Sequence, residues 1–188
     1  MTGAIIRIGR TKIDFPRADG SVDFTAMHPF YGPANSLNLL GQIRGSAENP
    51  TGLIEPTSRE IAVFAHSLFG DKRPIGKEAT GIMKSNYLRA FTGILYEPKT
   101  NLAYFIDYPK FGENSVVDGN DLQARVTQSY ARVPFEYVKE EAVAWDKVAK
   151  HPYFISWAHG QEGAEKLAEL ASKHPRKEAY VLVPNVSN

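Results

Sequence analysis

The sequence predicts an α+β protein whose sheet is antiparallel or mixed. Aromatic and β-branched residues are concentrated between Leu88 and Tyr108, on either side of the turn-forming cluster Glu97 to Asn101. Apolar residues recur at helical spacing from Ser58 to Phe69. We therefore expect a long central aromatic hairpin at about 88–108, helices packed on it, and a C-terminal strand-helix-strand unit.

The first elements expected along the chain are a short hairpin and a short helix. Thr11 to Phe15 and Ser21 to Thr25 alternate apolar and polar residues, and the Asp19-Gly20 pair between them favours a turn with positive φ. Prolines and glycines punctuate the stretch from His28 to Pro56, where Asn35 to Ile43 is the segment suited to a helix.

The helix over Ser58 to Phe69 carries both start and stop signals. Thr57 precedes it and Glu60 follows three residues later, the spacing of a capping box. Gly70 is placed to end the helix.

Both faces of the Leu88 to Tyr108 hairpin are largely apolar, which is typical of strands covered on both sides. Asp107 interrupts this pattern. A connecting loop of odd length, Glu97 to Asn101, places Arg89 on the same face as Asp107, and the sequence therefore predicts an ion pair between them.

Asn120 to Ala131 fits two periodicities, helical and alternating. The cap-like Asn120, with Gln123 three residues later, favours a helix, and a strand is the alternative. From Val138 to Lys150 the apolar residues fall on one helical face, so a helix is expected there, ended by Pro152.

The C-terminal unit is expected to run strand, helix, strand over Tyr153 to Trp157, Glu162 to Lys173 and Glu178 to Val183. If the two strands share a sheet, their connection is a right-handed crossover. A mixed α/β fold built through this unit is the alternative to α+β.

Composition limits the function classes. The 188 residues fit one globular domain, 1–188, and the absence of cysteine excludes disulfides, thiolate metal sites and a thiol nucleophile. It also favours a soluble, cytoplasmic protein. A net charge of +1 disfavours nucleic acid as a partner, and no segment is apolar for long enough to serve as a membrane span.

The turn between the strand and the helix expected in the C-terminal unit is the first candidate site. Free N–H groups at a helix N-terminus attract anions, and Gly160 and Gly163 let a ligand approach the backbone. A phosphate or carboxylate is thus expected at 159–163, with His159 as general acid or base. Alternatively, the glycines only permit a tight turn and His159 only ends a strand.

Four further residues join His159 as candidates. Asp107 is a possible second acid–base group and Arg89 a ligand contact, although a structural ion pair explains both. His28, held extended by Pro29, and Tyr31 are candidate ligand residues of the irregular loop. The five histidines show no metal-binding spacing, so neither a metal site nor a cofactor is predicted.

Two functions of different classes remain. The first is a non-catalytic binding or assembly protein, in which the aromatic hairpin provides a surface for a protein partner or for self-association. The second is a small metal-independent enzyme that binds an anionic substrate at the 159–163 turn. The enzyme requires His159 and another titratable group at one site.

Overall fold

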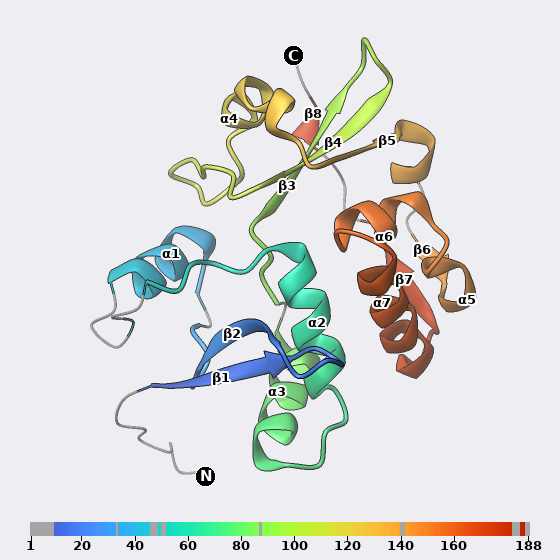
Figure 1. Ribbon diagram of the computed structural model, residues 1–188. Coiled ribbons are helices and arrows are strands. Elements are labelled where there is room, and N and C mark those ends of the chain that lie inside the picture. Colours follow the sequence, from blue (N-terminus) through green and yellow to red (C-terminus); the bar gives the residue numbers. More distant parts are fainter. Residues whose placement is uncertain are drawn as a thin grey trace. The chain divides into compact units, whose positions relative to one another are not determined.

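The computed structural model describes residues 10–32, 34–45, 49, 52–86, 88–139 and 142–181, together with the backbone of 185–186. The chain divides into two compact units, residues 1–55 and 56–188. It is α+β, as predicted, with helices and mainly antiparallel sheets (Figure 1). Among the described residues, no helix has the length and apolarity needed to cross a bilayer.

Unit 1 contains the predicted hairpin and short helix. Strands β1 (Thr11–Pro16) and β2 (Val22–His28) pair antiparallel, and Gly20 takes the positive φ of 84° that the turn between them requires. Helix α1 spans Ser36–Gly45, and the Asn35 side chain accepts the Asn38 N–H at its start. Both elements agree with the sequence.

Unit 2 begins with two helices. Helix α2 (Ser58–Leu68) has the predicted capping box, in which the Thr57 and Glu60 side chains bond each other's backbone N–H. Helix α3 (Pro74–Ser85) has no counterpart among the predicted elements. Its two glycines disfavour a helix by propensity, whereas a proline at its start is well suited to the first helical position.

A four-stranded sheet follows, in the order β5-β4-β3-β8. Strands β3 (Thr92–Glu97) and β4 (Leu102–Asp107) pair antiparallel, while β8 (Asn185–Val186) joins β3 in parallel. Strand β5 (Ala131–Pro134) is preceded by α4 (Gly119–Ala124) and the 3₁₀ turn Val126–Gln128. Segment 120–131, which fitted both a helix and a strand, therefore begins as helix and 3₁₀ turn, and strand β5 starts at its last residue, Ala131.

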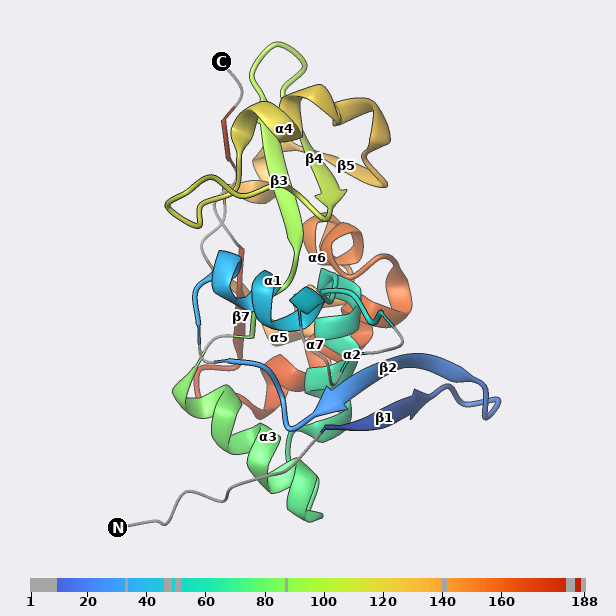
Figure 2. The same cartoon turned by 90° about the vertical axis from the view of Figure 1, so that its left-hand side faces the viewer.

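Both faces of the β3–β4 pair are covered, as the apolar pattern indicated. Ile94 and Phe105 face a core formed with the C-terminal helices, whereas Leu95 and Ile106 face Leu122 of α4. Figure 2 shows α4 beside the β3–β4 pair. Phe105, Leu95 and Ile106 are completely or almost completely buried.

The helix predicted for Val138 to Lys150 is wrong. This segment comprises the end of the 3₁₀ turn Phe135–Val138, strand β6 (Ala142–Ala144) and the short helix α5 (Trp145–Val148). The buried side chains are Val138, Val143 and Val148, whereas Trp145 of the supposed helical face is 42% exposed. Antiparallel pairing of β6 with β7 (Glu178–Tyr180) outweighs the helical pattern.

The strand predicted for Tyr153 to Trp157 is also wrong, and with it the strand-helix-strand unit. The segment is helix α6 (Pro152–Trp157), which Pro152 begins instead of ending the preceding element. Helix α7 (Gln161–Lys173) agrees with prediction and packs against α2, α5 and α6 (Figure 1). The last predicted strand, 178–183, is present as β7. Residues 182 and 183 of the predicted strand lie outside the described residues.

Candidate functional site

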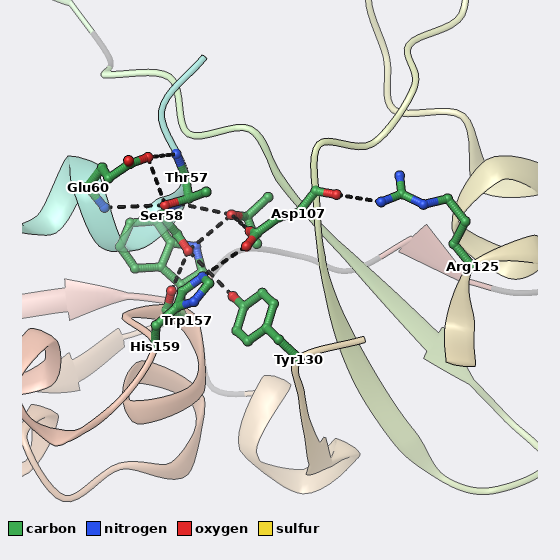
Figure 3. Close-up of polar contacts among 9 residues, drawn as sticks. Thr57, Ser58, Glu60, Asp107, Arg125, Tyr130, Trp157 and His159 are labelled. Atoms are coloured by element: carbon green, nitrogen blue, oxygen red, sulfur yellow. Dashed lines mark hydrogen bonds and ion pairs between the residues drawn. The ribbon is translucent and has the colours of Figure 1, made fainter. Parts of the chain in front are cut away.

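Five segments of unit 2 bring polar side chains together (Figure 3). Ser58 begins α2, Thr92 begins β3, and Asp107 ends β4. Tyr130 immediately precedes β5, and His159 lies in the turn between α6 and α7. We call these five residues the His159 cluster.

The pair His159 and Asp107 is the centre of this cluster. Nε2 of His159 lies 3.3 Å from Oδ2 of Asp107, and the two side chains are 22% and 19% exposed. Nε2 is buried and makes no hydrogen bond of normal geometry with any described residue. The Asp107 carboxylate thus lies at ion-pair distance from Nε2 without the alignment of a hydrogen bond.

The backbone of His159 is unusual for this residue type. The N–H groups of His159 and Gly160 donate to the carbonyls of Ser156 and Ile155, the two bonds of a Schellman motif at the end of α6. His159 takes the position of that motif where glycine is most common, with a φ of 57°. A side chain at this position costs about 1–2 kcal/mol relative to glycine.

Asp107 is held on its other side by Thr92, its cross-strand partner. Oγ1 of Thr92 lies 2.6 Å from Oδ1 of Asp107 and 3.1 Å from Oγ of Ser58, and it accepts the Ser58 N–H at 3.0 Å. Because Thr92 has one hydroxyl proton, the shorter, charge-assisted bond to the carboxylate takes it. Thr92 thus links the start of α2 to Asp107.

Ser58 is completely buried, and its hydroxyl donates to the Trp157 carbonyl, two residues before His159. Its other neighbours are the Thr92 hydroxyl at 3.1 Å and the Tyr130 hydroxyl at 3.5 Å. A hydroxyl that is buried and already donating is unsuited to nucleophilic attack. Ser58 therefore serves to tie the α6–α7 turn to the start of α2.

Tyr130 stacks on the imidazole of His159, with ring centroids 3.7 Å apart and an interplanar angle of 20°. Its surface is 36% exposed, but the hydroxyl lies inward beside Ser58. Burial raises the pKa of Tyr130, and the Asp107 charge raises it further. The phenol is therefore uncharged, and its stacking fixes the plane of the His159 ring.

The two glycines of the turn have different roles. Gly160 has a φ of 129° and open space where a Cβ would stand, so the backbone is accessible there. At Gly163 a Cβ would lie 2.3 Å from the Ala158 carbonyl oxygen, so glycine is needed for α7 to approach the turn. No side chain caps the N-terminus of α7.

The predicted ion pair between Arg89 and Asp107 is not formed. The loop joining β3 and β4 has an even length, because Glu97 pairs with Leu102, and this register places Thr92 opposite Asp107. The Arg89 guanidinium lies 5.4 Å from the centre of the Phe111 ring instead. A shift of one residue in register exchanges the faces of a strand, which is why Thr92 was missed.

His28 and Tyr31 lie in unit 1. The rings of His28 and Phe30 meet edge to face, and the Arg10 guanidinium lies 4.0 Å from the centre of the Tyr31 ring. Their role in ligand binding remains a prediction.

Outside the His159 cluster, the described residues offer no metal site and one surface hollow of note. No three His, Cys, Asp or Glu side chains of the described residues are grouped so that they could hold a metal ion. A surface hollow of about 530 Å³ shares no lining residue with the His159 cluster. It is lined by Tyr137, Asp146, Lys147, Lys150, His151 and Pro152.

Comparison with known proteins adds no assignment. No family model matches the chain, and neither the curated proteins nor the solved structures contain a significant match. Function must therefore be argued from the His159 cluster itself.

Proposed function

We propose that this protein is a metal-independent enzyme in which His159 transfers a proton and Asp107 orients its imidazole. The observation that carries the proposal is the approach of His159 Nε2 to within 3.3 Å of Asp107 Oδ2. A carboxylate that holds one ring nitrogen leaves the other, Nδ1, to take or give a proton. Nδ1 has no hydrogen-bond partner among the described residues.

Local structure supports a role beyond folding. Glycine suits the backbone of position 159 better than histidine does, since φ is 57° there. Backbone strain of this kind is concentrated at functional sites, where the side chain has a use that offsets its cost. The Tyr130 ring and the Asp107 carboxylate then hold the imidazole from two sides.

The substrate that we propose is a small anion with a phosphate or carboxylate group, bound at the 159–163 turn. The start of α7 offers backbone N–H groups without a side-chain cap, next to the open backbone at Gly160. Glu162 brings a negative charge to this turn, but its carboxylate is bonded to the Lys166 ammonium at 2.5 Å, which partly neutralises it.

The remaining parts of the proposal rest on composition. We propose that the reaction needs no cofactor and takes place in the cytoplasm, as the absence of cysteine favours. A net charge of +1 supports a small-molecule substrate over a nucleic acid.

Ligand-induced stabilisation tests the proposal. The protein is heated with inorganic phosphate, nucleotides or small carboxylates, and a ligand at 100 times its Kd stabilises the folded state by about 2.7 kcal/mol. For a chain of this size, we expect the Tm to rise by about 5–10 °C. The rise should be lost in His159→Gly and kept in His174→Gly, which removes an exposed histidine at the end of α7.

A ligand that stabilises His159→Gly as much as the wild type would remove the 159–163 turn from consideration. No response to any ligand would favour the second candidate, a binding or assembly protein. Its supporting observation is the exposure of Tyr180 (47%), which ends β7, and of Trp145 (42%), which directly follows β6. The β6–β7 sheet has two strands and no further one within the described residues. The aromatic hairpin itself is mostly buried.

A further inference from the structure

We propose that Arg125 is a positioning residue that acts on His159 through Asp107. This inference rests on the proposed function. Among the described residues, Arg125 makes no hydrogen bond or ion pair with His159 or with the 159–163 turn. Its guanidinium instead donates hydrogen bonds to the backbone at the end of β4, on the side of Asp107 opposite His159 (Figure 3).

Arg125 donates two hydrogen bonds to this backbone. Nη2 of Arg125 donates to the Asp107 carbonyl and Nη1 donates to the Tyr108 carbonyl, each at 2.8 Å. Tyr108 has a φ of 54°, a left-handed conformation that is costly for a tyrosine. The forked guanidinium therefore stabilises the turn by which the chain leaves the sheet immediately after Asp107.

Arg125 is itself held in place by Asp121. The carboxylate of Asp121 is 5% exposed and lies 3.2 Å from Nη1 of Arg125, and it also accepts the Lys110 N–H at 3.0 Å. Burial alone would raise the pKa of Asp121, but the Lys110 and Arg125 hydrogen bonds hold it below its ordinary value. A charged Asp121 thus fixes the guanidinium at the end of β4.

The consequence for the His159 cluster is geometric. Strand pairing with β3 fixes Asp107 on one side, and Arg125 fixes its carbonyl on the other. With the backbone held at both points, the carboxylate faces Thr92 and His159. Lysine at position 125 keeps the charge but has no fork with which to hold two carbonyls at once.

Acylation of His159 by diethyl pyrocarbonate measures this effect without a known substrate. An unprotonated ring nitrogen attacks a carbonyl carbon of the reagent and displaces ethyl carbonate, and a carboxylate partner makes an imidazole more nucleophilic. The rate at His159 is followed by mass spectrometry of its peptide, with the exposed His174 of the same sample as reference. Asp107→Asn should lower the His159 rate by about tenfold, the scale of such partner effects in metal sites.

Arg125→Ala should lower the His159 rate as much as Asp107→Asn does, and the double variant should be no slower than either. A general loosening of the fold would instead make the effects add. Arg125→Lys should be intermediate, and it replaces Arg125→Ala in the comparison if the alanine variant does not fold. Lys110→Ala, which removes a more distant ion-pair partner of Asp121, should keep the wild-type rate.

The outcomes separate the two proposals. If Asp107→Asn leaves the His159 rate unchanged, the coupling of Asp107 to His159 is absent and the proposed function fails with it. If Asp107→Asn slows the reaction but Arg125→Ala and Arg125→Lys do not, Arg125 has no positioning role and the proposed function stands. Additive effects in the double variant would also overturn the inference.

Discussion

His159 occupies a backbone position that its own side chain disfavours. The Schellman motif at the end of α6 requires a positive φ at residue 159, where glycine is free of strain and histidine is not. The contacts with Tyr130 and Asp107 compensate for part of this cost. The balance between backbone and side chain at this one residue can be measured.

The two variants His159→Gly and His159→Ala separate these contributions. Both remove the imidazole, but only alanine keeps a Cβ in the left-handed conformation, so we expect the glycine variant to be more stable by about 1 kcal/mol. Urea denaturation of the two variants gives the difference directly. Equal stabilities would mean that residue 159 does not keep its positive φ in solution.

At the scale of elements, sequence patterns correctly predicted the helix that interactions close in sequence stabilise. The capping box of Thr57 and Glu60 lies within one turn of chain, and α2 was predicted with its start correct. Segment 138–150 depends on a partner some 35 residues away, because Val143 pairs with Ala179, and no pattern in the segment itself indicates this. Pro152 was predicted to end the preceding helix, whereas it begins α6.

The same limit applied to the His159 cluster. Asp107 was identified because it interrupts an apolar pattern, and His159 because it stands in a glycine-containing turn before a predicted helix. Thr92, Tyr130 and Ser58 were missed, because only the register of the hairpin and the packing of α6 and α7 bring them there. No local sequence pattern predicts side chains that reach a site from distant elements.

Two glycine-to-alanine substitutions test how closely α7 approaches the α6–α7 turn. A Cβ at Gly163 would lie 2.3 Å from a backbone oxygen, so Gly163→Ala should destabilise the protein by about 1–3 kcal/mol. Gly81, in the exposed interior of α3, has no atom within 4 Å of a Cβ, and Gly81→Ala should stabilise by about 0.5–1 kcal/mol. The Tm of Gly163→Ala should therefore fall and the Tm of Gly81→Ala should rise. A higher Tm for Gly163→Ala would contradict the close approach of α7 to the turn.

At the scale of the molecule, the small core of unit 1 bears on how the chain unfolds. Among its described residues, the buried apolar side chains are Phe15, Met27 and Ile43. Full burial of such a side chain contributes about 1.5–3 kcal/mol, and ordering each residue of the chain costs about 1.5 kcal/mol. With this core, the described part of unit 1 is not expected to be stable by itself.

We therefore propose that residues 1–188 form one cooperative domain and unfold in a single transition. The two tryptophans, Trp145 and Trp157, both lie in unit 2, so their fluorescence reports that unit alone, whereas far-UV circular dichroism reports both. The two signals should give the same midpoint in urea, and the calorimetric and van't Hoff enthalpies should agree. If instead the dichroism changes at a urea concentration where the fluorescence does not, unit 1 unfolds separately. The His159 cluster, which lies entirely in unit 2, would then belong to a domain of residues 56–188.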